Sequence, residues 1–163
     1  MNPPIDIEHL ATRLPPKARL IGLDLGTKTI GLAISDVERR LASPLKTLTR
    51  VAFQKDADAL LSICAEFEIA GLILGLPLDL EGRDGPRAQS TRAFARNLST
   101  RSELPIAFWD ERFSTAVVTR SLIANDVSRA RRARVVDKMA AAYILQGALD
   151  RLAGLARNPT DAS

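Results

Sequence analysis

Residues Leu20–Asp36 read LIGLDLGTKTIGLAISD and contain two short apolar runs, Leu20–Leu25 and Ile30–Ile34, separated by a polar turn that opens on glycine. Apolar runs this short, bounded by turn residues, predict the two strands of a β-hairpin with one buried face. Asp24 interrupts the apolar pattern. Because burying an unpaired carboxylate costs several kcal/mol, it is expected to have a metal ion, a base or a hydrogen-bond network as its partner. A metal ligand and a structural aspartate bonded to the turn amides both remain open.

The composition predicts a single domain with an aliphatic core. The chain has 163 residues, of which 46% are hydrophobic but only 4% aromatic, and this length is enough to bury a substantial core. The net charge of +4 is a moderate sign of a polyanionic partner. The arginines gather in two segments, which contain Arg83, Arg87, Arg92 and Arg96, and Arg129, Arg131, Arg132 and Arg134.

Several classes of protein are disfavoured. Cys64 is the only cysteine and His9 the only histidine, which argues against a disulfide framework, a histidine metal cage and a Ser-His-Asp triad. No apolar run approaches the roughly 20 residues of a transmembrane helix. The start of the chain, MNPPIDIEHL, lacks the basic and apolar regions of a secretory signal, so we expect a cytoplasmic protein without a membrane partner.

The remaining pattern predicts a mixed α/β sheet. An outer strand with a proline is followed by alternating helices and strands, an order that implies an antiparallel meander extended by βαβ crossovers. The expected strands are 41–49, 70–76 and 105–109, and the expected helices are 54–68, 87–99, 114–124 and 135–152, with a loop at 77–86 and a basic connection at 125–134. We expect an N-terminal extension at 1–18, one domain at 19–152 and a polar tail at 153–163.

Three acidic residues fall where such a sheet would bring them together. Asp24 lies on the first strand, Glu111 follows a later strand, and Asp137 lies in the first turn of the last helix. Carboxylates from separate elements suit Mg²⁺ or Mn²⁺, because hard cations prefer oxygen ligands, and two such ions can promote phosphodiester cleavage. The alternatives are a helix-dipole contact for Asp137 and a surface ion pair for Glu111.

Basic residues are predicted beside these acids. Lys28 lies in the turn after Asp24 and could reach a phosphate, with the amides of Gly26 and Thr27 next to it. The arginines at 129–134 could contact backbone phosphates without reading sequence. For both, the alternative is a solvated surface charge.

The motifs as a whole resemble a known family from about Arg19 to Asp150. These motifs are GLDLGTKTIGLAISD, LGLPLDLEGRDGPRA, RAFARNL, WDERFST and VSRARRARVVDKMAAAYILQGALD. The chain resembles the YqgF family, also called RuvX, whose members are ribonuclease-H-like and are described both as Holliday junction resolvases and as pre-16S rRNA nucleases.

The resemblance implies a five-stranded ribonuclease-H-like sheet and metal-dependent endonuclease chemistry. By motif position, Asp24, Glu111 and Asp137 look like the family's acidic triad. Asp110 and Arg112 belong to the same motif as Glu111 and would orient it or touch phosphate. Arg87, Lys28 and the arginines at 129, 131, 132 and 134 would contact nucleic acid. The family usually has an arginine where this chain has Thr29.

Four functions follow as alternatives. The first is a nuclease that matures the 5′ end of pre-16S rRNA, acting on the RNA or on ribosomal precursor particles, as a monomer or homodimer. The second is a resolvase that cuts branched DNA and should be a two-fold dimer. The third is an ATP-binding protein, because DLGTKTIG also resembles the phosphate-binding hairpin of the sugar kinase, actin and Hsp70 group. The fourth is a precursor-rRNA binder without catalytic activity.

Overall fold

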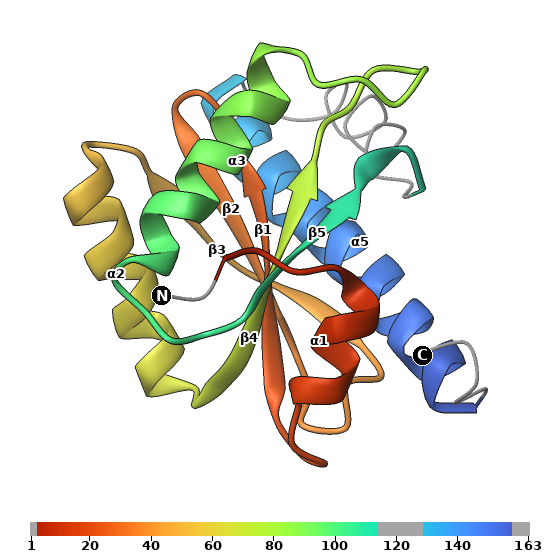
Figure 1. Cartoon of the computed structure of the whole chain (residues 1–163). Coiled ribbons are helices and arrows are strands. Elements are labelled where there is room, and N and C mark those ends of the chain that lie inside the picture. The colour runs from red at the N-terminus through yellow and green to blue at the C-terminus, as the bar shows by residue number, and fades with distance from the viewer. Residues whose placement is uncertain (1–2, 114–128, 158–163) are drawn as a thin grey trace.

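A computed structural model describes residues 3–113 and 129–157, with side chains from 134 onward in the second range. Its centre is a mixed sheet of five strands in the order β3-β2-β1-β4-β5 (Figure 1). Strands β1, β2 and β3 pair antiparallel, while β4 pairs parallel with β1 and β5 pairs parallel with β4. The predicted meander of three strands with two parallel strands is confirmed. The strands are β1 (Arg19–Leu25), β2 (Thr29–Ser35), β3 (Ala42–Thr49), β4 (Ile69–Leu76) and β5 (Ile106–Asp110).

Helices cover both faces of the sheet (Figure 1). Helices α2 (Phe53–Glu66) and α3 (Pro86–Ser99) pack on one face. Helices α1 (Ile7–Arg13) and α5 (Arg129–Arg157) pack on the other. A single 3₁₀ turn, η1 (Glu111–Phe113), follows β5. Because successive strand residues point to opposite faces, each strand contributes alternate side chains to two separate cores.

Strand β1 shows this division most clearly. Ile21 and Leu23 belong to the core under α2 and α3, whereas Leu20 belongs to the core under α5. Gly22 shares the face of Leu20, and a Cβ atom at Gly22 would lie 2.7 Å from the Cβ of Leu145 on α5. The helix therefore packs directly on the β1 backbone, and this close approach brings the start of α5 to the same end of the sheet as Asp24.

The last helix differs from its prediction at both ends. Helix α5 begins at Arg129, inside the expected basic connection, and ends at Arg157 instead of Leu152. A glycine in a helix costs about 1 kcal/mol relative to alanine, yet Gly154 lies inside α5. Leu155 is almost fully buried against the α1 side of the core, and its packing extends the helix past the glycine. The helix predicted at 114–124 lies outside the described residues.

The segment before β1 packs on the domain and contains a helix that the sequence pattern did not predict. Ile5 forms a parallel bridge with Ala107 on β5, and Asp6 caps α1 by accepting a hydrogen bond from the His9 amide at 2.8 Å. Leu10 is fully buried. Within the part of the chain that the structure describes, no helix is both long enough and apolar enough to cross a membrane.

Candidate active site

Asp24 lies on the sheet face that α5 covers, at the C-terminal end of β1. It alternates with Leu20 and Gly22 on that face, and only 2% of its surface is exposed. Its partner across the β1–β2 ladder is Gly31. A buried carboxylate therefore stands in the sheet with no side chain opposite it on the neighbouring strand.

Asp137 is brought to this position by the packing of α5 on Gly31. A Cβ atom at Gly31 would lie 2.1 Å from the carbonyl oxygen of Asp137, so the helix backbone rests on the Cα of the glycine. Thr29, two residues earlier on the same face of β2, donates a hydrogen bond from Oγ1 to Oδ2 of Asp137. The hydroxyl fixes the direction of that carboxylate from the strand below it.

Glu111 approaches Asp24 from the opposite side. It opens η1 directly after β5 and is 6% exposed. A Cβ atom at Gly75 of β4 would lie 2.8 Å from Oε1 of Glu111. Gly75 follows Leu74, and Leu74 pairs with Leu23, so Gly75 is the neighbour of Asp24 on β4. The carboxylate of Glu111 therefore lies over the strand next to Asp24.

Together these contacts place Asp24 between two glycines, with Asp137 over one and Glu111 over the other. We call these three carboxylates the acidic site. Oxygen donors of this kind match a hard divalent cation in chemistry. Among the described residues, however, no three His, Cys, Asp or Glu side chains are grouped closely enough to hold a metal ion as they stand. The three predicted acids share one face and one end of the sheet without forming a closed metal cage.

Asp110 and Arg112 form an ion pair beside the acidic site. Nε and Nη2 of Arg112 donate to the Asp110 carboxylate at 3.0 Å and 2.5 Å, and Nη1 donates to the carbonyl of Leu80 at 3.3 Å. The hydrogen bonds from Arg112 lower the pKa of Asp110, and the same pairing raises the pKa of Arg112. Gly82, at φ +83°, lies under the guanidinium. Arg112 thus joins the strand end to the loop between β4 and α3.

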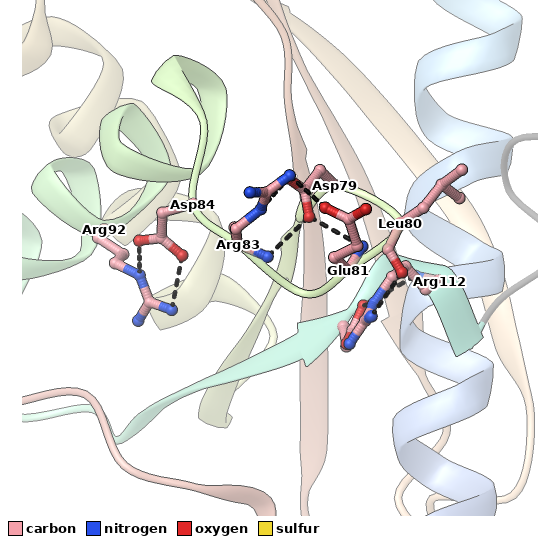
Figure 2. A network of polar contacts seen from close by, with 8 residues as sticks. Asp79, Leu80, Glu81, Arg83, Asp84, Arg92 and Arg112 are labelled. Carbon is pink, nitrogen blue, oxygen red and sulfur yellow. Dashed lines mark hydrogen bonds and ion pairs between the residues drawn. The ribbon is translucent and has the colours of Figure 1, made fainter.

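That loop is held by further ion pairs (Figure 2). Arg83 donates from Nε to Asp79 at 3.0 Å and also pairs with Glu81. Arg92 on α3 pairs with Asp84 at 2.6 Å. The hydrogen bond from the Arg83 backbone amide to Oδ1 of Asp79, at 2.8 Å, is the main cause that lowers the pKa of Asp79. Much of the charge in the first arginine-rich segment is therefore balanced by carboxylates of the same loop.

The predicted nucleic-acid contacts are only partly described. Lys28 is exposed in the β1–β2 turn, and Arg87 donates from Nη2 to the Leu25 carbonyl at 3.3 Å. Arg134 is exposed at the start of α5 and donates to Oγ1 of Thr49 at 3.1 Å. These three residues surround the end of the sheet that carries Asp24. The side chains of Arg129, Arg131 and Arg132 lie outside the described set.

The sequence prediction did not include the residues that arrange the acids. Thr29, Gly31 and Gly75 carry no charge, and the partner of Thr29 is 108 positions away. A signal was present in the glycines, because a glycine inside a strand often marks a close approach of another backbone. Gly22 and Gly31 lie on the Asp24 face of their strands, and α5 contacts both.

Comparison with known proteins identifies the family. The family model described as "RuvX: Holliday junction resolvase" matches residues 18–151. The chain belongs to the RuvX family. A relative from Methylocella silvestris is 60% identical over 148 residues, which cover 91% of this chain and 92% of the relative. Another from Rhodopseudomonas palustris TIE-1 is 62% identical over 147 residues, covering 90% and 92%. Both bear the name "Putative pre-16S rRNA nuclease".

Solved structures confirm a ribonuclease-H-like fold for this RuvX protein. Thermus thermophilus RuvC in complex with a Holliday junction substrate superimposes with a TM-score of 0.52 at 12% identity, covering 83% of this chain and 96% of RuvC. The yeast mitochondrial resolvase Ydc2 gives the same TM-score and identity and covers 96% and 88%. At this identity the likeness concerns the fold.

Proposed function

We propose that this RuvX protein is a metal-dependent endonuclease that processes the 5′ end of pre-16S rRNA. The relatives that share about 60% of its sequence carry the name of a pre-16S rRNA nuclease. Such a substrate, free or within ribosomal precursor particles, would place the protein in the cytoplasm and make it part of ribosome biogenesis. The fold is one on which nucleases are built.

The observation that carries this proposal is the position of Asp24 between Gly31 and Gly75. Because Gly31 and Gly75 have no side chains, Asp137 and Glu111 have room to approach the buried carboxylate. Hydrolysis of a phosphodiester needs an activated water and positive charge against the phosphate oxygens, and carboxylates cannot supply that positive charge. A constellation of acids at one strand end is therefore suited to recruit cations.

In this proposal Asp24, Glu111 and Asp137 would hold Mg²⁺ or Mn²⁺, as one ion or a pair. When bound there, such a cation would supply Lewis-acid stabilisation of the phosphate and would make a ligated water more acidic. The residues of the chain do the positioning. Thr29 holds Asp137 through its hydroxyl, and the protein backbone at Gly31 and Gly75 sets the spacing. Lys28, Arg87 and Arg134 would hold the nucleic-acid backbone.

The decisive experiment compares cleavage by wild type, Asp24→Asn and Asp58→Asn with Mg²⁺, with Mn²⁺ and with EDTA. Asp58 is an exposed residue of α2 paired with Arg101, so its variant removes an equal charge away from the acidic site. We expect metal-dependent cleavage of precursor 16S rRNA by wild type and Asp58→Asn, and loss of more than about a thousandfold in Asp24→Asn. Equal activity of Asp24→Asn, or cleavage in EDTA, would overturn the proposal.

A Holliday junction resolvase is the second candidate, because the family model carries that description. A resolvase introduces paired cuts across a symmetric junction and is expected to be a two-fold dimer. A four-way DNA junction offered at the same salt as the RNA separates the two candidates. Symmetric cleavage of the junction by a protein with a dimeric mass, without cleavage of the RNA, would favour the resolvase.

A further inference from the structure

A cavity of about 510 Å³ opens at the β1–β2 turn, on the side of α2 and α3 and away from the acidic site. We call it the turn cavity. Three segments form its walls: the turn residues Gly26 and Thr27, the segment that runs from Arg50 into α2, and the first turns of α3, including Arg87 and Ser90. Its lining begins at Leu25, the last residue of the strand that carries Asp24, so a ligand there would lie near the acids but around the edge of the turn.

Two arginines dominate this cavity. Nη1 of Arg50 donates to the Gly26 carbonyl at 2.6 Å, and Nη2 of Arg87 donates to the Leu25 carbonyl at 3.3 Å. Each guanidinium has five N–H donors, and these bonds use one from each. Neither has a carboxylate partner among the described ion pairs, in contrast to Arg83, Arg92, Arg101 and Arg112. Most of their donors therefore remain for a ligand.

The surroundings favour an anion over a cation. Hydroxyl groups of Thr27 and Ser90 line the same cavity. Among the described residues that line it, Asp56 is the one acid; it is buried, and its Oδ1 accepts from the Val51 amide at 3.0 Å. The N-termini of α2 and α3 also open here without side-chain caps, which adds to the positive potential set by the arginines.

We propose that the turn cavity binds a phosphodiester of the nucleic-acid substrate, on the strand that passes through the acidic site. Arg50 and Arg87 would contact the phosphate oxygens with their remaining donors, a geometry in which arginine is effective. Because the cavity and the acidic site lie on opposite faces of the sheet, the strand would bend around the β1–β2 turn, past exposed Lys28. The identity of the ligand rests on the nuclease function proposed above.

The test measures binding, without cleavage, of a labelled single-stranded RNA in EDTA over a range of salt concentrations. The main variant is Arg50→Gln/Arg87→Gln. Its matched control is Arg13→Gln/Arg157→Gln, which removes the same charge from the ends of α1 and α5; Figure 1 shows those ends far from the β1–β2 turn. For a single strand, each phosphate contact contributes about 0.7 to the slope of log affinity against log salt concentration. We expect the main variant to bind about tenfold more weakly, with a slope smaller by about 0.7, and the control to match wild type.

A second variant guards against loss of folding in the first. Ser90 is exposed on α3, so Ser90→Glu adds a carboxylate to the cavity without removing either arginine, and Ser90→Ala is its control. We expect weaker RNA binding for Ser90→Glu alone. Unchanged RNA affinity in both cavity variants would overturn the proposal. A second outcome would also overturn it: inorganic phosphate raises the melting temperature of wild type but not of the cavity variants, while all of them bind RNA equally well. The cavity would then bind a small phosphate compound.

Because these readouts need no cleavage, they separate the two proposals. If RNA binding depends on the turn cavity but Asp24→Asn still cleaves, the proposed role of the acidic site is overturned and the proposed role of the turn cavity is supported. If Asp24→Asn is inactive but the cavity variants bind and cleave as wild type, the nuclease stands and the cavity fails.

Discussion

Asp24 and Gly31 face each other across the β1–β2 ladder, and the carbonyl of Asp137 occupies the space that a side chain on Gly31 would need. The glycine thus sets how close the last helix can come to the buried acid. Since the contacting atoms belong to the helix backbone, a larger residue cannot be accommodated by a rotamer change. The helix itself would have to move.

Gly31→Ala is expected to displace the start of α5, to destabilise the fold by about 1–3 kcal/mol and to reduce cleavage strongly. Gly154→Ala, on α5 itself, is the control, because no described residue beyond the neighbouring helix backbone lies within 4 Å of its added Cβ. That change should leave activity intact and stabilise the helix slightly. Denaturant unfolding and cleavage rates measure both. A fully active, stable Gly31→Ala protein would contradict the packing described.

Thr29→Val removes the hydroxyl that donates to Asp137 while it keeps the shape of the side chain. A hydrogen bond to a charged group contributes about 1.5–3 kcal/mol, so the rate should fall at least tenfold. Thr29→Ser should restore most of it. The cleavage rate is measured over a range of Mg²⁺ concentrations. If Thr29 positions Asp137, its loss should shift the Mg²⁺ concentration that gives half of the maximal rate, whereas partial unfolding would lower the rate at every concentration. Equal midpoints in Thr29→Val and wild type would argue against a positioning role.

Asp110→Asn tests the ion pair with Arg112. The pairing lowers the pKa of Asp110 below its ordinary value of 3.8, so its stabilisation is present above about pH 4 and is lost as the pH falls through the lowered pKa. Asp110→Asn should therefore have a melting temperature a few degrees below wild type at pH 7. The melting temperatures of the two proteins should become equal as the pH falls below 4. A constant difference across this range would show that the charge of Asp110 is not responsible.

Cys64 should be inert in the folded protein. Burial in the core under α2 raises the pKa of its thiol to about 12, so almost no thiolate exists at neutral pH. A thiol-reactive reagent should label it only after denaturation, with one thiol per chain. Rapid labelling of the native protein with loss of cleavage would contradict this expectation.

Leu10→Ala tests whether the N-terminal segment belongs to the fold. Leu10 is fully buried in the core shared with α5, and removing such a side chain typically costs about 2–5 kcal/mol. Ala11→Gly, in the same helix at a less buried position, is the control; it removes one methyl group packed on the same core and costs about 1 kcal/mol in helix propensity. If Leu10→Ala unfolds at the same denaturant concentration as wild type, the segment contributes nothing to stability.

The hairpin and Asp24 could be predicted because their signals are local, whereas Glu111 and Asp137 were grouped with Asp24 by the expected sheet and by motif position. Two short apolar runs on either side of a polar turn identify the strands, and Asp24 is the charged residue within the first run. The helix α1 could not be predicted in this way. It has seven residues between prolines, and its stability comes from burying Leu10 against residues far along the chain. The end of α5 depends in the same manner on the burial of Leu155.

The arrangement of the site was less predictable than its members. The bonds from Arg112 to Asp110 and to the Leu80 carbonyl were not predicted, and its expected role at Glu111 or at a phosphate stays a prediction. The role of the Thr29 hydroxyl could not be predicted, because its partner, Asp137 on α5, is far away in the sequence. Tertiary contacts of this kind have no signature in composition or periodicity, although strand glycines indicate where another backbone must approach.

Helix α5 is continuous from Arg129 to Arg157, and at 1.5 Å per residue the step from Arg151 to Asp137 spans about 21 Å. Arg151 pairs with Glu8 of α1 at 3.2 Å. The N-terminal segment therefore contacts the C-terminal half of α5, and the N-terminal half of the same helix carries Asp137 of the acidic site. Loss of the packing between α1 and α5 would change the tilt of α5 on the sheet. That change would move Asp137 even though α1 does not touch the acidic site.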